Sequence, residues 1–255
     1  MITALLKPLV ICVTEQSLIM NQRKILNIRL YASMPITLYY YPASPGPRLV
    51  LATAKAIDLD VDVRLVDLLA KEHLKEEYLK INPEHTIPTL DDNGFIIWDS
   101  HAIATYLVSQ YGKDDSLYPK DPKKRARVDQ RLYFEATTLF PRLKAITFPL
   151  LFLGKNEVEP DKKAALYDAV GLLEKYLEPT GWVAGDGATI ADIACAATAS
   201  SILESGVDFT AFPRTRSWLE RCSRDVPGFE AANAEGAKQL GQVISSRLPP
   251  SALAL

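Results

Sequence analysis

In the first part of the chain, apolar residues recur with the spacing of β-strands. Residues 36–41 are a run of aromatic and other β-prone residues, and residues 61–67 alternate apolar with charged positions. Between these two runs, residues 49–55 are apolar enough to form a buried helix, which we expect to begin after Ser44. The order strand, helix, strand predicts a crossover connection and a parallel pair of strands.

The next segments predict a hairpin. Residues 68–78 form a loop that leads into a short helix, and residues 82–90 lead into a third strand. Asp92-Asn93-Gly94 is a strong hairpin turn sequence, and residues 95–99 supply the returning strand. Ser100 is the expected cap of a helix that runs to about Tyr111. A parallel pair joined to a hairpin predicts a mixed sheet of four strands.

Beyond a polar linker at residues 113–121, every apolar pattern has the period of a helix. The expected helices start near residues 121, 157, 189, 214 and 226. Proline removes a backbone donor, so the first of them should kink near Pro141 and end near Pro149. The pattern therefore predicts an α/β domain at 35–112, an all-helical domain at 122–244, and a loose tail at 245–255.

Residues 1–33 differ from the rest of the chain. They contain one acid, Glu15, and four basic residues, and their apolar run is broken by Lys7 and Pro8. This run is far shorter than the ~20 residues that a membrane-spanning helix needs. We expect an extension that is disordered or lies outside the fold, with Met34 as a possible working start. Organelle targeting and a membrane-active segment are the alternatives.

Composition and charge exclude several classes of partner. The chain of 255 residues has 29 lysines and arginines against 31 acids, so no basic field is available for nucleic acid or anionic membrane. Three widely spaced cysteines form neither a disulfide framework nor a metal pattern, which favours a reducing compartment such as the cytoplasm. The three histidines contain no His-x-x-x-His pair, so we expect no metal site.

Ser44 is the first candidate for chemistry. Pro45 follows it at the position where a helix tolerates proline best, so Ser44 stands at a helix N-terminus. Unpaired backbone N–H groups and a partial positive charge favour an anion there, and a thiolate is an anion. The simpler interpretation, that Ser44 only caps its helix, stays open on these residues alone.

Over about residues 35–240 the chain resembles a cytosolic glutathione S-transferase of the insect delta and epsilon classes, most closely epsilon. Six runs in the right order and at the right spacing carry the resemblance: Leu38-Tyr39-Tyr40 with Ser44-Pro45, Leu68-Leu69-Ala70 with Glu72-His73-Leu74, residues 82–88, residues 99–103, residues 111–119, and Thr189-Ile190-Ala191-Asp192. The resemblance implies a thioredoxin-like domain with a mixed four-stranded sheet, followed by an all-helical domain, in a homodimer. Thr189 and Asp192 match a helix-start motif, which we assign to folding.

The resemblance also implies an activity: transfer of reduced glutathione, the co-substrate, to hydrophobic electrophiles in xenobiotic detoxification. Isomerisation, dehydrohalogenation or peroxide reduction could use the same site, and a biosynthetic role is open. The alternative is a non-catalytic protein that binds or sequesters hydrophobic ligands. A thiol–disulfide exchange protein would need cysteine at the helix start, where Ser44 and Pro47 stand.

Carried over residue by residue, the resemblance implies that Ser44 donates a hydrogen bond to the glutathione sulfur. Asp99 and Ser100 would hold the γ-glutamyl end, and Ile87, before a cis Pro88, would pair with the cysteinyl unit. The remaining implied glutathione contacts are His73, His85, Thr86 and Lys144. His101 is interpreted as structural.

The resemblance places the hydrophobic substrate site on the helix that follows the linker. Its candidate residues are Phe140, Leu143, Thr147, Phe148 and Leu151. Three residues depart from the family pattern. Gly46 stands where a second proline is frequent, which should loosen the turn at Ser44. Asp99 replaces the commoner glutamate, and Lys144 replaces an arginine, so a bidentate contact would be lost.

Overall fold

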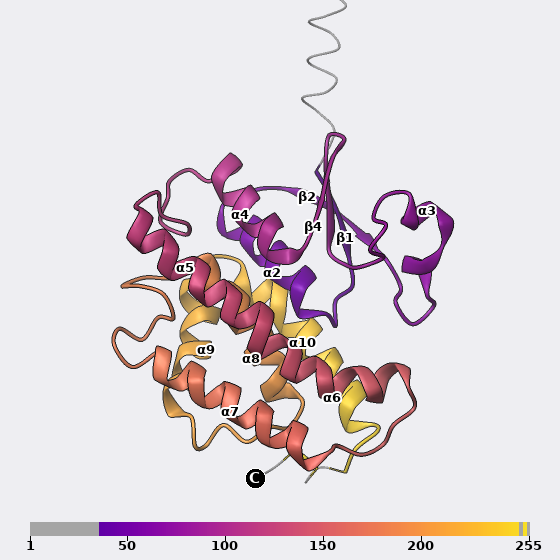
Figure 1. Ribbon diagram of the computed structural model, residues 1–255. Helices are drawn as coiled ribbons and strands as arrows, with labels where there is room; N and C mark the ends of the chain where they lie inside the picture. The colour runs from indigo at the N-terminus through magenta and orange to yellow at the C-terminus, as the bar shows by residue number, and fades with distance from the viewer. Residues whose placement is uncertain (1–35, 250–251, 254–255) are drawn as a thin grey trace, which may run out of the picture. The chain divides into compact units, whose positions relative to one another are not determined.

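The computed structural model describes residues 36–249 and 252–253 (Figure 1). The predicted extension at residues 1–33 lies outside the described residues. No helix within the described ranges is long and apolar enough to cross a membrane.

A mixed sheet of four strands begins the described chain, as the sequence predicts. The strands are β1 (Ile36–Tyr40), β2 (Val61–Leu65), β3 (Thr89–Asp92) and β4 (Phe95–Trp98), in the order β2-β1-β3-β4. β1 is parallel to β2 and antiparallel to β3, and β3 and β4 form the expected hairpin. Asn93 and Gly94 have φ values of 53° and 91° in the hairpin turn, the left-handed region that this Asn-Gly pair favours.

The helices of this first region also follow the predicted order. α2 (Pro45–Ala56) connects the parallel strands, η1 (Glu72–Leu74) and α3 (Glu76–Leu79) precede β3, and α4 (Ser100–Tyr111) follows β4. One local prediction is wrong: Asp99 caps α4, and Ser100 is its first residue. The Asp99 carboxylate reaches two backbone N–H groups, which a serine side chain one residue later could not do from inside the helix.

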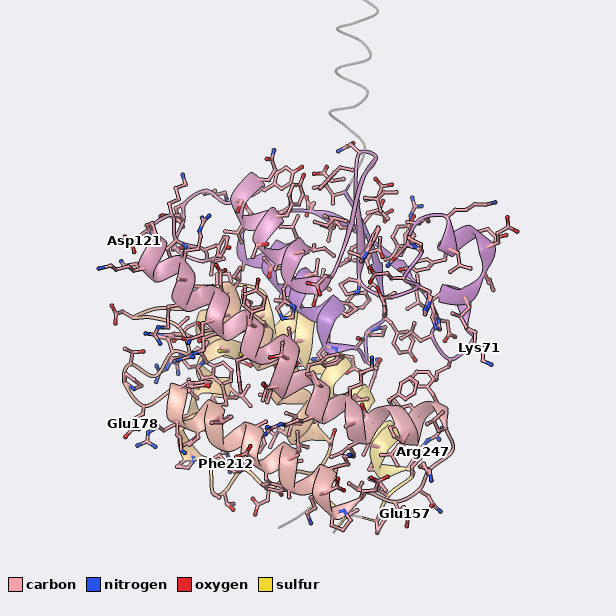
Figure 2. The ribbon with its side chains drawn as sticks, in the orientation of Figure 1. Lys71, Asp121, Glu157, Glu178, Phe212 and Arg247 are labelled. Atoms are coloured by element: carbon pink, nitrogen blue, oxygen red, sulfur yellow. The ribbon has the colours of Figure 1, made fainter. Side chains whose placement is uncertain are left out.

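The second region is helical. Its elements are α5 (Pro122–Phe134), the π-helical turn η2 (Glu135–Leu139), α6 (Phe140–Phe152), α7 (Pro160–Tyr176), α8 (Ile190–Glu204), α9 (Pro213–Asp225) and α10 (Phe229–Ser245). Figure 1 shows α5, η2 and α6 as one long helical path, with α7 beside it. Asp121, labelled in Figure 2, lies at the start of α5. Its carboxylate caps the helix by accepting a 2.9 Å hydrogen bond from Lys124 N–H. α8, almost wholly buried, forms the centre of this region.

Two proline effects differ from expectation. The irregularity before Pro141 is the π-helical turn η2, which inserts an extra residue into the helical path. α6 continues three residues past Pro149, to Phe152, although we predicted an end near the proline. Pro149 lacks an N–H donor, but its carbonyl still accepts a 3.1 Å hydrogen bond from Leu153 N–H, so the last turn of the helix closes.

Leu248 and Leu253, in the segment where the sequence predicted a loose tail, pack against the helical region. The side chains of Leu248 and Leu253 are 7% and 3% exposed. Tyr167 Oη donates a 2.7 Å hydrogen bond to the Leu253 carbonyl. The guanidinium of Arg247 donates to the Leu150 carbonyl in the last turn of α6. The prediction of a loose tail rested on its polar composition. Burial of two leucine side chains, each contributing about 1.5–3 kcal/mol, stabilises the packed arrangement instead.

The helix that carries Ser44 is anchored to the helical region. Arg48 of α2 is fully buried, and its guanidinium donates to the Asn233 side chain on α10 and to the Ser201 hydroxyl on α8. α10 also contacts the turn before Ser44 closely: a Cβ on Gly236 would lie 2.1 Å from the Pro42 carbonyl oxygen. Packing of α8 and α10 therefore fixes where the start of α2 lies.

Candidate active site

A cavity of about 260 Å³ lies at the N-termini of α2 and α4 and is closed by η2 and the start of α6. It brings together most of the residues that the sequence predicts for glutathione. The lining consists of Ser44, Gly46, Glu84, Thr86, Ile87, Pro88, Trp98, Asp99, Ser100, His101, Glu135, Ala136 and Phe140. His73, His85 and Lys144, which we also expected to contact glutathione, are outside this lining.

Ser44 occupies the N-cap position of α2 with an extended backbone, φ −84° and ψ 130°. Its side chain makes no capping hydrogen bond to the helix, and it lines the cavity half-buried. The first turn of α2 contains no acidic residue that would offset the positive end of the helix. The hydroxyl is therefore available to donate to an anion held in the cavity.

Gly46 brings the starts of α2 and α4 together. A Cβ at this position would lie 3.2 Å from Ser100 Oγ and 3.3 Å from Pro88 Cδ, closer than most real Cβ contacts. We expected Gly46 to loosen this turn, but the structure gives it a packing role. Because Gly46 has no side chain, α2 can approach Ser100 and Pro88 closely. The peptide bond between Ile87 and Pro88 is cis, as expected.

Backbone groups next to Pro88 stay outside the sheet ladder. β3 pairs with β1 only from Thr89 onward, so Ile87 lies two residues before the first paired residue and lines the cavity. Asn82 is fully buried, and its Nδ2 donates a 3.0 Å hydrogen bond to the Thr86 carbonyl, which fixes the loop that precedes Ile87. Ile87 can therefore offer its backbone to an extended peptide-like ligand in the manner of an added strand.

Asp99 connects β4 to α4 in a conformation that few non-glycine residues adopt, with φ 71° and ψ 118°. Its Oδ1 accepts hydrogen bonds from His101 N–H at 2.9 Å and Ala102 N–H at 3.0 Å. The neighbouring His101 and these two N–H groups hold the pKa of Asp99 below its ordinary value, against the effect of burial. An ionised carboxylate thus stands beside the Ser100 hydroxyl at a helix N-terminus, a pairing that suits a group with one ammonium and one carboxylate.

His101, which the sequence analysis interpreted as structural, lies between two acids at the wall of the cavity. Its Nε2 is 2.7 Å from Glu135 Oε2, and its Nδ1 is 3.6 Å from Asp99 Oδ1. Burial lowers the pKa of His101, but the two carboxylates outweigh it and raise the pKa to about 9. At neutral pH the imidazole is therefore a cation that joins the cap of α4 to the helical region.

Glu135, which sequence reasoning missed, comes from the π-helical turn. It is buried, and its second oxygen accepts a hydrogen bond from the Thr198 hydroxyl on α8. Its pairing with His101 follows no sequence spacing, because it connects residues of two different regions across the cavity. In the sequence, Glu135 stands out only as a charged residue among apolar positions with helical spacing. That pattern does not indicate which residue it pairs with.

His73 and His85 form a separate pair with ring centroids 6.4 Å apart. His73 lies in η1, and its Nδ1 is buried with no hydrogen-bond partner among the described residues. Burial and the neighbouring His85 lower the pKa of His73, so the ring is neutral at neutral pH. The two imidazoles can still act together as hydrogen-bond donors to an anionic group.

The predicted hydrophobic site is only partly supported by burial. Leu143 and Thr147 are 2% and 8% exposed and point into the helical core, so the structure places them away from any open site. Phe140 and Phe148 instead line a second cavity of about 480 Å³, and Leu151 is half-buried outside it. The full lining of the second cavity is Ala136, Phe140, Pro141, Lys144, Ala145, Phe148 and Pro149. The helical spacing of the apolar residues predicted a helix over these positions. It did not distinguish the face that packs in the core from the face that lines the second cavity.

No group of three or more histidine, cysteine, aspartate or glutamate side chains within 36–249 and 252–253 is arranged to hold a metal ion. Together, the mixed sheet, the helical region and the cavity between them define a thioredoxin-like domain followed by an all-helical domain, with a serine at the N-terminus of the first helix.

Comparisons with known proteins agree with this class. The family described as "Glutathione S-transferase, N-terminal domain" matches residues 38–115, and "Glutathione S-transferase, C-terminal domain" matches residues 124–225. "Glutathione S-transferase 1" of Manduca sexta is 44% identical over 219 residues, which cover 84% of this chain and all of that protein. The chain belongs to the glutathione S-transferase family.

Two solved structures give the same result for the fold. A delta-class glutathione transferase of Nilaparvata lugens is 46% identical, with a TM-score of 0.80 over 84% of this chain and 100% of that one. An epsilon-class glutathione S-transferase of the housefly, Musca domestica, is also 46% identical, with a TM-score of 0.79 over 83% of this chain and 98% of that one. The protein is an enzyme of this family, and glutathione is its co-substrate.

Proposed function

We propose that the protein conjugates reduced glutathione with hydrophobic electrophiles, and that Ser44 stabilises the glutathione thiolate. The observation that carries this proposal is the Ser44 hydroxyl, which lines the cavity at the N-terminus of α2 and makes no capping bond. A free thiol has a pKa of about 8.5, so only a small part is thiolate at neutral pH. Lowering that pKa by about two units stabilises the anion by about 2.7 kcal/mol.

In this mechanism Ser44 is a hydrogen-bond donor and does not act as a base. The thiol proton leaves to solvent, and the hydroxyl donates to the sulfur anion near the positive end of α2. The sulfur then attacks the electrophilic carbon, a C–S bond forms, and the leaving group departs with the electron pair of the bond that breaks. Ser44 is kept in place by Gly46 and by the contact of α10 with Pro42.

The rest of the cavity provides for the other parts of glutathione. Asp99 would receive the γ-glutamyl ammonium, and the Ser100 hydroxyl with the start of α4 its carboxylate. The backbone of Ile87 would pair with the cysteinyl unit, next to Thr86 and Pro88. We assign the glycyl carboxylate to the His73–His85 pair, whose ring N–H groups can donate hydrogen bonds.

Further parts of the proposal rest on family membership. The glutathione-binding part corresponds to residues 35–112, the linker to 113–121, and the helical part with the electrophile site to 122–244. The family descriptions support this division because they match residues 38–115 and 124–225 separately. The epsilon class stays a proposal, since the delta and epsilon structures are equally identical to this chain. We also propose a homodimer that works in the cytoplasm.

The test compares the wild-type protein with Ser44→Ala in the conjugation of glutathione to 1-chloro-2,4-dinitrobenzene. We expect Ser44→Ala to lower kcat/KM at least tenfold while glutathione still binds, a loss of about 1.4 kcal/mol of transition-state stabilisation. Thr180→Ala, which removes a hydroxyl on the exposed loop between α7 and α8, is the matched control and should leave the rate unchanged.

Equal rates for wild type and Ser44→Ala would show that Ser44 only occupies the N-cap position of α2. Glutathione binding without turnover in either protein would favour the non-catalytic alternative, a protein that sequesters hydrophobic ligands. A second readout separates chemistry from binding. At saturating glutathione, the pH profile of kcat/KM for the electrophile reports the pKa of the bound glutathione thiol. This pKa should rise toward 8.5 in Ser44→Ala.

A further inference from the structure

The second cavity opens directly beside the glutathione site. Ala136 and Phe140 line both cavities, so the two spaces meet at the start of α6. Phe140 lines the same cavity as Ser44, and the other residues of the second cavity, except Ala136, follow Phe140 along α6. An electrophile held there would present its reacting carbon at the Phe140 end.

The wall of this second cavity is apolar except for one cation. Two phenylalanines, two alanines and two prolines surround Lys144, whose Nζ lies 5.9 Å from the centre of the Phe148 ring. No carboxylate of the described residues forms an ion pair with Lys144. Two of the acids that line the first cavity, Asp99 and Glu135, face His101. The cavity therefore offers one positive charge that no carboxylate of residues 36–249 and 252–253 pairs with.

The spacing along α6 fixes where that charge stands. Phe140, Lys144 and Phe148 are four residues apart, so they lie on one stripe of the helix, about 6 Å from one to the next. Phe152 continues the stripe, and its ring centroid is 5.1 Å from that of Phe148. An aromatic electrophile that reacts above Phe140 would direct the substituent opposite its reacting carbon toward Lys144.

We infer that this site selects electrophiles that carry a carboxylate on an apolar or aromatic body, with Lys144 as the residue that recognises the carboxylate. The inference rests on the proposed conjugation at Ser44. A neutral ring would fill the same apolar wall, but its substituent would leave the ammonium unpaired in the bound complex. Phe148 and Phe152, 43% and 42% exposed, would cover any apolar extension of the ligand.

The proposed reaction in this pocket is nucleophilic aromatic substitution. The glutathione sulfur forms a bond to the ring carbon that carries chlorine, the C–Cl bond breaks, and chloride leaves with the bonding electrons. The ring gains negative charge as the sulfur adds, and a carboxylate on the ring adds a second negative charge. Lys144 offsets part of this charge, so its effect should reach the transition state as well as binding.

The experiment measures kcat/KM of the full chain for two matched substrates, 4-chloro-3,5-dinitrobenzoate and 4-chloro-3,5-dinitrobenzamide, at one saturating glutathione concentration. The quantity of interest is the ratio of the two values, because any effect on glutathione binding cancels in it. We expect Lys144→Met to lower the benzoate-to-benzamide ratio about fivefold or more, as expected for one exposed charge pair near the protein surface. Lys144→Arg keeps the charge and should keep the ratio.

Lys123→Met is the control for net charge, since Lys123 is exposed on α5 and does not line the second cavity. The ratio of the wild-type protein should also fall as salt is raised, because salt screens an exposed charge pair, and the Lys144→Met ratio should not. An unchanged ratio in Lys144→Met overturns the inference, even when both rates fall together. Turnover of neither ring by the wild-type protein overturns the proposed conjugation, and the inference with it.

Discussion

At the scale of single residues, His101 decides the electrostatics at the wall of the glutathione cavity. The imidazole lies 2.7 Å from one acid and 3.6 Å from the other, and each acid has a further structural role. Asp99 caps α4, and Glu135 accepts from Thr198 on α8. A cation at this position therefore joins the helix that begins at Ser100 to the helical region.

We predict that His101→Gln lowers the free energy of unfolding by about 3 kcal/mol at pH 6, since it leaves two acids without their cation. The pKa of His101 is raised to about 9 in the folded protein, above its ordinary value of 6.5. The stabilisation is therefore complete below about pH 6.5 and is lost as the pH rises through 9. Chemical denaturation at pH 6, 8 and 9.5 should show the difference between the two proteins becoming smaller.

His85→Gln is the matched control for this prediction, because His85 is exposed and forms no ion pair among the described residues. A constant difference between wild type and His101→Gln across that pH range would contradict the ion pair. It would mean that the ring contributes only packing.

At the scale of elements, the contact between α10 and the turn before α2 controls the position of Ser44. Gly236 is the point of closest approach, with room for no side chain between α10 and the Pro42 carbonyl. Arg48 also connects α2 to Asn233 on α10 and to Ser201 on α8. The site at the start of α2 thus depends on a helix from the other end of the chain.

Gly236→Ala should therefore destabilise the protein by about 1–3 kcal/mol and lower kcat, because the new Cβ would lie 2.1 Å from a backbone oxygen and 2.6 Å from Arg48 Cδ. The sign is diagnostic, since alanine ordinarily stabilises a helix interior relative to glycine. Thermal unfolding and the rate of glutathione conjugation measure the two effects.

Gly185→Ala serves as the control, because nothing lies within 4 Å of a Cβ built there. A stabilised Gly236→Ala protein with unchanged kcat would show that α10 can move away from Pro42 without displacing Ser44.

At the scale of the whole molecule, the C-terminal residues close the helical region. Leu248 packs into the core, and the Leu253 carbonyl accepts from Tyr167 on α7, which also accepts a 3.1 Å hydrogen bond from Asp208 N–H. These contacts join the end of the chain to segments far earlier in the sequence.

We expect Leu248→Ala to lower the free energy of unfolding by about 2–4 kcal/mol, the usual effect of a cavity in a core. Leu153→Ala, at a leucine that is 62% exposed, should change it by less than about 0.5 kcal/mol. Urea denaturation of both variants makes the comparison. Equal effects would mean that the tail contributes no packing.

Local chemistry explains what was predictable from the sequence. The strands, the Asn93-Gly94 turn, the two regions and the serine at the start of α2 all follow from signals within a few residues, such as apolar period, turn propensity and proline position. The cap of α4 was misplaced by one residue, because both Asp99 and Ser100 are good capping residues and only backbone geometry distinguishes them.

The sequence by itself determined the order of the elements, the family, and part of the lining around Ser44, namely Thr86, Ile87, Pro88, Asp99 and Ser100. Only the tertiary structure decided which face of α6 is open, because periodicity groups residues on a face but does not say which face meets the core. It placed Leu143 and Thr147 inside, and Phe140, Lys144 and Phe148 at the second cavity. It also paired His101 with Glu135, since contacts between distant segments depend on how whole elements pack.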